Sequence, residues 1–437
     1  MYKPNFNQRR ALRFRQFTRK RWALFACLGR VVTISVLSVA TLQSAAAATD
    51  DDGKTAVGNS VADNVSQPDK EATLDDVEVT GSRAPLALGQ AARMVTVLSR
   101  DEIQAAPVQS INDLLKYAVG VDVRQRGPIG AQTDIGIRGS TSEQITILLN
   151  GINICDPQTG HNAFDLPCDI MDIERIEILE GPAGRVYGTS SLVGAINIVT
   201  RTASSNKADV RLEGGSFGYL SAAGRLAMGG HSLSANYTRS DGYSRAKSGA
   251  LNSDYSGGKV FYQGEYGHEN LRLKWHAGLS TKGFGSNTFY SAKFDEQFEK
   301  TVKIFTALQG DFTVGPLHLR PSINWNRSHD RFELIRGSET KVPFNYHRTD
   351  VFGLSLNSYF DWLLGRTAFG AEFRNEDIVS TNLGEPLSEV FSHYKVGLNR
   401  SNLSFHLEHN ILLSRFTLSA GFLAIKNTWN EIGRAHV

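Results

Sequence analysis

The second half of the chain alternates apolar and polar side chains over segments of about ten residues, and this pattern restricts the fold most. LRLKWHAGLS (271–280) places Leu and Trp on one face and Arg272, Lys274 and His276 on the other. LHLRPSINWN (317–326) and RFTLSAGFLA (415–424) repeat the pattern. A uniformly apolar face behind a polar one is what a strand needs when it separates lipid from a wet lumen.

The connections between these segments sort by length. GGH, YGHEN, TVGP, DWLLGR and HNILLSR are short, whereas the long polar ones fall around 239–255, 281–298, 328–349 and 376–399. Apart from a tight first connection, short and long alternate. Short periplasmic turns and long external loops are typical of outer-membrane barrels, and a soluble sandwich has no reason to sort its loops this way. We therefore predict a transmembrane antiparallel β-barrel over 207–430.

The number of predicted strands is odd. We count about eleven, whereas single-chain bacterial barrels close with an even number and leave no edge exposed to lipid. The sequence thus predicts that about half of the barrel is present and that the chain is truncated at its C-terminus. EIGRAHV (431–437) resembles a translated sequencing adapter, so we predict a non-native tail there.

The first 73 residues read as export and linker segments. Residues 1–47 are a predicted signal peptide, with a basic start, the apolar VVTISVLSVATL and the small residues QSAAAA. Residues 48–73 are acidic and polar, which predicts a disordered periplasmic arm.

Disulfides persist outside the cytoplasm, so Cys155 and Cys168, thirteen positions apart, form either a bridge or two unpaired thiols.

Residues 88–203 mix helical and strand patterns. MVTVL, TDIGIRG, ITILLNG and RIEIL have the composition of short strands, and Ser99 and Ser110 stand where helices would begin. Ile111, Leu114 and Leu115 follow the second of these at helical spacing. The region is predicted to be a compact α/β domain of about a hundred residues.

The glycine-rich stretch RIEILEGPAGRVYGTSSLVGAINIVT (175–200) raises the possibility of a phosphate site. Its glycines fit neither GxxxxGK[ST] nor GxGxxG, and a β-branched run follows, so turns between packed strands explain them better.

The net charge of the chain is only +3, so it does not create the positive electrostatic field that would attract nucleic acid, and we expect no nucleic-acid partner. No HExxH, GxSxG or paired-carboxylate arrangement stands out, so we expect no enzyme.

The order of these parts resembles the TonB-dependent outer-membrane receptors, over about residues 72–430. LDDVEVTGSR (74–83) resembles the TonB box, and VQSINDLLKYAVGVDV, IGIRGS, ILLNGI and the 175–200 stretch resemble successive plug motifs. The resemblance implies a barrel of about twenty-two strands around an α/β plug, in the outer membrane of a Gram-negative bacterium. It implies a structural role for Arg138, Gly139, Gly181, Pro182, Tyr187, Gly188 and Asn197.

The resemblance also implies partners. The C-terminal domain of the inner-membrane protein TonB would pair with the box strand, which comprises Asp76, Val77, Glu78, Val79 and Thr80. A first strand of the following domain would give the same pattern. Outer-membrane lipid, a small-molecule ligand and a surface or periplasmic binding lipoprotein are the other expected partners.

In the family the apical plug loops meet the ligand, and the matching stretches are 124–134 and 153–168, of which the second resembles cobalamin-type receptors. The implied ligand-binding residues are Arg126, Gln132, Asp156, Gln158, His161 and Asn162, with simple loop hydrogen bonding as the alternative. The implied function is energised uptake of a corrinoid or a ferric siderophore. A passive porin and a surface binding or signalling receptor are the alternatives.

No cofactor is required by this function, and the identity of any metal stays open. Asp156, Asp165 and Asp169 offer oxygen ligands of the kind that calcium takes, but they match no calcium-loop spacing. His161 is a further candidate as a haem ligand.

Overall fold

The computed structural model describes residues 78–79, 84–87, 94–162, 164–181, 191, 193–203, 205–245, 249–413 and 416–428. All of them belong to one compact unit, Lys70–Val437. The predicted signal peptide (1–47), arm (48–73) and tail (431–437) lie outside the described residues. Within the described ranges, no helix has the length and apolar character needed to cross a membrane.

A five-stranded sheet forms the centre of the first folded part, the plug. Its order is β3 (Met94–Leu98), β8 (Ile173–Glu180), β9 (Gly194–Thr200), β6 (Ile145–Leu149) and β7 (Ile152–Asn153). Strands β6 and β9 are parallel, and the other pairs are antiparallel. The predicted strands MVTVL, ITILL and RIEIL are therefore confirmed.

Both helices of the plug begin at the predicted serines. Ser99 accepts a hydrogen bond from the Glu102 amide and closes a capping box before α2 (Arg100–Ala105). Ser110 caps α3 (Ile111–Leu114) in the same way, with 3.2 Å between its Oγ and the Asp113 nitrogen. The remaining elements are η3 (Leu115–Tyr117), the hairpin of β4 (Val121–Arg126) and β5 (Gln132–Ile137), η4 (Pro128–Gly130), η5 (Ser142–Gln144) and η6 (Ile170–Asp172).

Branched side chains from the central strands fill the plug core. Ile147, Ile178 and Ile196 are at most 1% exposed, and they pack with Leu114 of α3 in one cluster. Complete burial of one such side chain contributes roughly 1.5–3 kcal/mol. This shared core is why the short strands and helices form one domain, as the α/β prediction requires.

Gly194 opens β9 where the backbone of β8 passes closely. A Cβ at this position would lie 2.6 Å from the Leu179 carbonyl oxygen and 2.9 Å from Ile137 Cδ1. Because backbone gives way less readily than a side-chain tip, we expect Gly194→Ala to destabilise the plug by about 1–3 kcal/mol. Urea unfolding should show a lower midpoint than for Gly267→Ala, whose Cβ would meet nothing within 4 Å. Equal midpoints would contradict the expectation.

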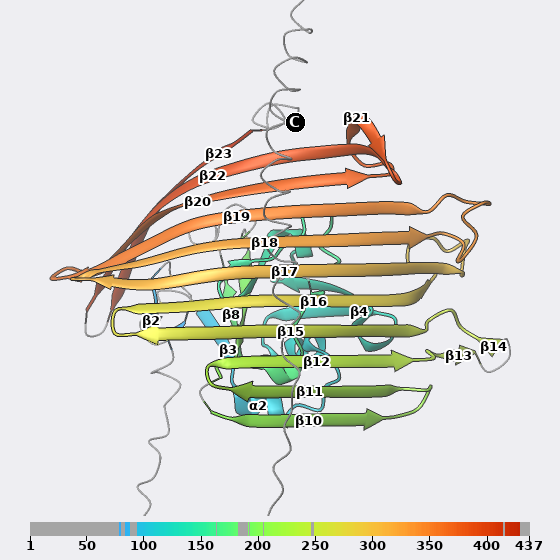
Figure 1. Ribbon diagram of the computed structural model, residues 1–437, viewed down its shortest axis with the longest axis horizontal. Coiled ribbons are helices and arrows are strands. Elements are labelled where there is room, and N and C mark those ends of the chain that lie inside the picture. The colour runs from blue at the N-terminus through green and yellow to red at the C-terminus, as the bar shows by residue number, and fades with distance from the viewer. Residues whose placement is uncertain are drawn as a thin grey trace, which may run out of the picture. The chain divides into compact units, whose positions relative to one another are not determined.

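The second part is an antiparallel sheet of twelve strands (Figure 1). In spatial order these are β10 (Lys207–Gly214), β11 (Leu220–Met228), β12 (His231–Ser240), β15 (Tyr255–His268), β16 (Leu271–Asn287), β17 (Gln297–Val314), β18 (Leu317–Glu333), β19 (Asn345–Trp362), β20 (Gly365–Ser380) and β22 (Tyr394–Leu412), with β21 (Glu385–Phe391) and β23 (Thr417–Asn427) both paired to β22. Apart from β21, which belongs to a hairpin in the last long connection, the strands run up and down as predicted.

In this sheet the apolar side chains face outward and the polar ones face inward, which is the reverse of the arrangement in a soluble protein. Leu212, Leu308 and Leu354 are exposed on the outside, whereas Ser280 and Asn326 are buried on the inside. Polar side chains toward the lumen and apolar ones away from it are what a lipid-facing strand requires. The burial of the side chains therefore confirms the predicted membrane barrel.

The connections separate onto two rims. The two-residue turns 229–230, 269–270, 315–316 and 363–364 lie on the left in Figure 1, which we call the short-turn rim. The long connections 241–254, 288–296, 334–344 and 381–393 lie on the right, at the long-loop rim. This sorting is the predicted one, and it identifies the long-loop rim as the external side.

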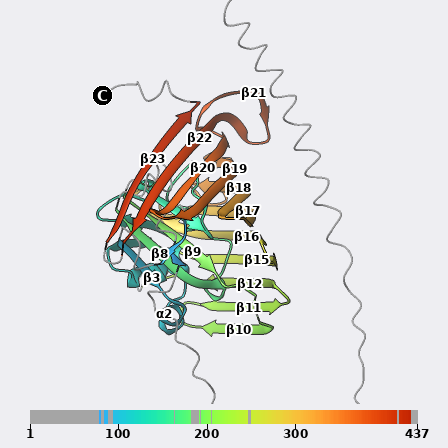
Figure 2. The same ribbon diagram turned by 90° about the vertical axis from the view of Figure 1, so that its left-hand side faces the viewer.

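Figure 2 shows that the sheet curves around the plug strands β3, β8 and β9. Among the described strands, β10 pairs only with β11 and β23 pairs only with β22, so the sheet is open. The fold is a transmembrane antiparallel β-barrel, about half present, with an α/β plug on its concave face.

Candidate functional site

Two plug loops, 126–132 and 153–168, reach toward the long-loop rim and are fastened to the wall there. Lys282 on β16 joins them, because its Nζ donates to the Ala131 carbonyl oxygen at 2.6 Å and lies 2.5 Å from Asp165 Oδ1. Thr301 on β17 donates to the other Asp165 oxygen at 2.9 Å. These contacts fix the height of both loops in the barrel.

Arg126 and His161 are the predicted ligand-binding residues that face solvent. Their side chains are 44% and 41% exposed, and both bind the carboxylate of Asp134 on β5. Arg126 Nη2 lies 3.3 Å from Asp134 Oδ2, and His161 Nδ1 makes a short hydrogen bond to Asp134 Oδ1. Asp134 therefore holds a cation and an imidazole side by side at the apex.

Gln132 and Asn162 are buried, at 1% and 8% exposure. Gln132 donates to the Tyr290 hydroxyl at 3.0 Å, and Tyr290 donates to Glu299 at 2.5 Å. Their amide oxygens, Gln132 Oε1 and Asn162 Oδ1, have no hydrogen-bond partner among the described residues. A ligand role for either remains a prediction, since in this structure they lie at the plug–wall contact beneath the surface.

Asp156 and Gln158 also turn toward the wall. Asp156 accepts a hydrogen bond from Thr349 on β19 at 3.2 Å, and Gln158 donates to Asp330 on β18 at 3.1 Å. Asp156 in addition accepts from the Gln158 backbone at 2.9 Å. The loop hydrogen bonding that the sequence left as the alternative is thus present, and the ligand role of these two residues stays a prediction.

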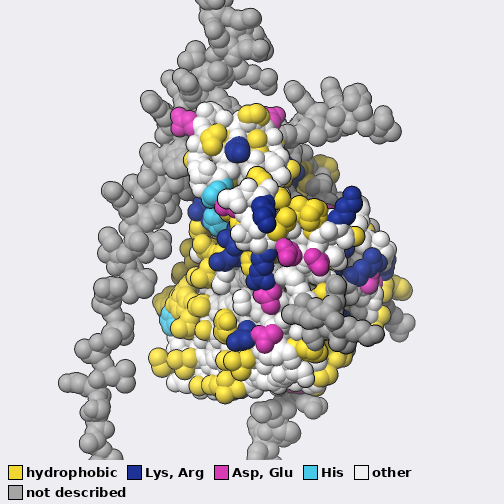
Figure 3. All heavy atoms as spheres, turned by 90° about the vertical axis from the view of Figure 1, so that its right-hand side faces the viewer, with side chains coloured by type: hydrophobic (Ala, Val, Ile, Leu, Met, Phe, Trp, Pro, Cys, Tyr) yellow, Lys and Arg dark blue, Asp and Glu magenta, His cyan; other side chains and the backbone are white. Residues whose placement is uncertain are grey.

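The wall supplies carboxylates that sequence reasoning missed. Glu299 and Thr301 face inward from β17, and Thr301 is paired in register with Asp330. Glu299 and Asp330 are therefore diagonal neighbours in the ladder of β17 and β18, and diagonal neighbours interact. Their two carboxylates share one inner surface with Asp165. Figure 3, which views the long-loop rim, shows basic and acidic side chains interleaved in its middle and hydrophobic ones along one margin. The period-two burial of β17 turns Glu299 inward, and the register with β18 brings it beside Asp330.

The residues of the predicted structural motif act within the plug. Arg138 has a φ of 54° and lies 3.4 Å from Glu180, and Gly139 and Gly181 have positive φ values. Asn197 donates to Glu177 at 3.1 Å and accepts from the Gly151 amide at 2.9 Å. Pro182, Tyr187 and Gly188 lie outside the described residues.

Cys155 and Cys168 are free thiols and form no disulfide bridge with each other, so of the bridge and the unpaired thiols that the sequence left open, the structure has the unpaired thiols. Cys155 Sγ accepts from the Ile147 amide at 3.2 Å, whereas Cys168 is completely buried in the plug core. Burial raises the pKa of both thiols. Neither is therefore activated as a nucleophile.

The predicted TonB box lies partly in the described chain. Glu78 and Val79 form β1 and pair with Ala87 and Leu86 of β2 (Leu86–Ala87). Leu86 is buried, and the Pro85 carbonyl oxygen accepts a hydrogen bond from Arg366 on β20 near the short-turn rim. Asp76, Val77 and Thr80 lie outside the described residues. The short strand is thus anchored by the residues that follow it.

The base of the plug carries an ion pair with the wall. Asp172 of η6 lies 3.5 Å from Arg225 Nε on β11, and both side chains are at most 2% exposed. Asp172 also accepts from Ser234 at 2.6 Å and from the Asp169 amide at 2.9 Å. Burial nevertheless raises the pKa of Asp172 to about 6. We refer to Asp172, Arg225 and Ser234 as the base latch.

Within the described residues, no group of three or more His, Cys, Asp or Glu side chains is arranged to hold a metal ion. Calcium and haem binding at the apex stay predictions.

Comparison with known proteins agrees with this geometry. Residues 87–195 match the family model described as TonB-dependent Receptor Plug Domain. The chain is 34% identical over 138 residues to the "Vitamin B12 transporter BtuB" of Vibrio vulnificus and 30% identical over 160 residues to that of Photobacterium profundum. These matches cover 32% and 36% of this chain, and 22% and 26% of the relatives.

Solved structures extend the likeness to the wall. The ferric yersiniabactin uptake receptor FyuA from Yersinia pestis aligns over 77% of this chain and 61% of its own, with a TM-score of 0.55 and 16% identity. The ferric citrate transporter FecA aligns over 81% and 59%, with a TM-score of 0.62 and 15% identity. The chain thus carries the plug domain of the TonB-dependent receptors, and its described residues share their fold of a plug and a barrel sheet. The receptor belongs to the outer membrane of a Gram-negative bacterium.

Proposed function

We propose that this receptor binds a scarce, large ligand outside the cell and imports it into the periplasm with energy delivered through TonB. The observation that carries this is the plug, which lies on the concave face of the sheet and is bonded to the wall at the apex and the base. A passive porin needs an open lumen, so this plug disfavours it. The similar proteins include vitamin B12 transporters and ferric-chelate receptors, and this supports uptake of a corrinoid or a ferric siderophore.

The solvent-facing pair Arg126 and His161 supports an external binding site at the plug apex. A guanidinium and an imidazole held by one carboxylate offer donors to a polar or anionic ligand. The buried partners beneath them, Gln132 and Asn162, would keep the apical loops in place while the ligand docks.

Ligand titration on outer-membrane vesicles tests this site. The receptor, expressed from its complete reading frame, is titrated with cobalamin and with a panel of ferric siderophores. The double variant Arg126→Ala/His161→Ala should weaken binding of the recognised ligand by roughly 10- to 100-fold. Lys116→Ala, a plug cation of the same 44% exposure, is the matched control and should bind normally. Failure of every ligand to bind would refute the proposed ligand class, and unchanged affinity of the double variant would refute the site.

A further inference from the structure

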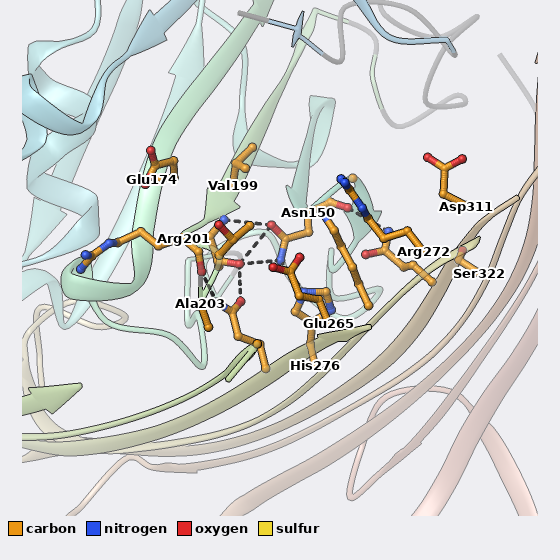
Figure 4. Close-up of a pocket in the computed structure, with 18 of the residues that line it drawn as sticks. Asn150, Glu174, Val199, Arg201, Ala203, Glu265, Arg272, His276, Asp311 and Ser322 are labelled. Carbon is orange, nitrogen blue, oxygen red and sulfur yellow. Dashed lines mark hydrogen bonds between the residues drawn. The ribbon is translucent and has the colours of Figure 1, made fainter. Parts of the chain in front are cut away.

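A cavity of about 650 Å³ lies between the base of the plug and the inner face of the sheet, at β10, β11 and β15 to β19 (Figure 4). Asn150 and Arg201 of the plug line it together with Arg272 and His276 of β16, and Asn150 lies in contact with His276. The wall residues that line it lie near the short-turn ends of their strands, far from the apical loops. Its volume is within the range of small-molecule pockets.

Positive charge dominates the lining, which holds seven Lys or Arg residues and three carboxylates. Five of the seven are held by carboxylates in the pairs Arg175–Glu177, Arg201–Asp209, Lys207–Asp209, Arg225–Asp172 and Arg320–Asp311. The side chains of Arg272 and Lys274 make neither a hydrogen bond nor an ion pair with any described residue, although Glu265 and Asp311 lie close enough to act on Lys274 electrostatically. Two cations without a bonded carboxylate therefore remain at the cavity wall.

These two cations form a row with His276. The three residues alternate along β16, so they share the inner face at a spacing of roughly 7 Å. The Asn150 amide is oriented by the Thr200 backbone, which donates to Asn150 Oδ1 at 2.9 Å, so Asn150 Nδ2 donates to His276 Nε2. The proton of the neutral imidazole is then on Nδ1.

His276 Nδ1 is a buried donor without a partner among the described residues, and the side chain is only 6% exposed. A buried donor left unsatisfied costs about 1–3 kcal/mol. An acceptor that enters the cavity would recover part of this energy and would also meet Lys274 and Arg272.

We propose that this row, Arg272, Lys274 and His276, binds a small anionic group, a carboxylate or a phosphate, at the periplasmic side of the plug. The group would belong to a soluble molecule or to a phospholipid headgroup. Glu265 is the internal competitor, since it is paired in register with Lys274 but makes no ion pair with it. The inference is separate from ligand recognition at the apex.

Isothermal titration calorimetry tests the row. The detergent-solubilised receptor, expressed from its complete reading frame, is titrated at low salt with inorganic phosphate, citrate and short-chain phosphatidylglycerol. Arg272→Gln/Lys274→Gln should weaken binding at least about tenfold, and Glu265→Gln should strengthen it. Lys274→Arg, which keeps the charge, should bind as the unchanged receptor does. Lys300→Gln, which removes a charge from the exposed face of β17, is the matched control.

The outcomes separate clearly. Binding of phosphate or citrate that depends on the row supports a soluble anion, and binding of phosphatidylglycerol alone supports a headgroup. Absence of binding for all three probes, or equal affinity for the double variant and the Lys300→Gln control, would overturn the inference. Heat-modifiable mobility on gels verifies that each variant has folded. Ligand binding at the apex, measured on the same preparations, is expected to be unaffected by the row variants.

Discussion

A receptor that carries Val79→Pro should bind its ligand with unchanged affinity and import almost none of it. Val79 lies in β1, paired with Leu86 of β2. A partner strand that adds to this segment depends on main-chain hydrogen bonds, and proline removes the amide donor and fixes φ. If TonB pulls on this strand, the loss of one donor in so short a ladder should reduce energised uptake by at least about tenfold.

The control for this prediction keeps the amide. Val79→Ile is β-branched and preserves the backbone donor, so it should import normally. Uptake of labelled ligand is measured in energised cells, and binding is measured on the same cells after the proton gradient has been dissipated. Normal import by the proline variant would rule out strand pairing at Val79 as the route of energy transfer. Loss of binding as well as import would show that the substitution had damaged the plug itself.

The inside and outside of the barrel wall could be predicted from single residues. In β16 the period-two pattern assigned His276 to the polar face and Leu279 to the apolar one, and the structure buries the first and exposes the second. Ser99 and Ser110 likewise marked both plug helices. These predictions succeed because they depend on local geometry and on one neighbouring medium.

The contacts that position the site could not be predicted in this way. Lys282 meets Asp165 across 117 positions of sequence, and Arg225 meets Asp172 across 53. Such pairs depend on how the plug is seated against the strands, which no local pattern encodes. For the same reason the resemblance, which implied a ligand-binding role for Gln132, could not show that this side chain is buried against Tyr290.

The base latch should make the stability of the plug depend on pH. Burial raises the pKa of Asp172 to about 6 from an ordinary value of 3.8, so the folded protein holds this proton more tightly than the unfolded chain does. The stabilisation by protonation is therefore fully present below about pH 4 and is lost as the pH rises through 6. A rise of this size in the pKa corresponds to roughly 3 kcal/mol. Asn at position 172 cannot ionise. Asp172→Asn should therefore remove this part of the pH dependence of the free energy of unfolding, which urea unfolding between about pH 4 and pH 7 measures.

Removing the arginine of the base latch should lower the free energy of unfolding more than removing the carboxylate does. Arg225→Leu leaves the Asp172 carboxylate buried without its counter-charge, and such a loss typically costs about 3–5 kcal/mol at neutral pH. Urea unfolding, followed by a fluorophore on the plug, measures this cost at pH 7 and again at pH 4. The cost should shrink at pH 4, because the carboxylate can then take up a proton.

The double variant decides whether the charge or the packing of Arg225 matters. Arg225→Leu/Asp172→Asn has no buried charge at the latch, and the amide oxygen that replaces the carboxylate would remain an acceptor for Ser234. Replacing both members of a buried ion pair is often neutral, so the double variant should recover most of the stability that Arg225→Leu loses. If instead the two losses simply add, the pair is not electrostatically coupled, and Arg225 would stabilise the plug–wall contact through the packing of its alkyl chain.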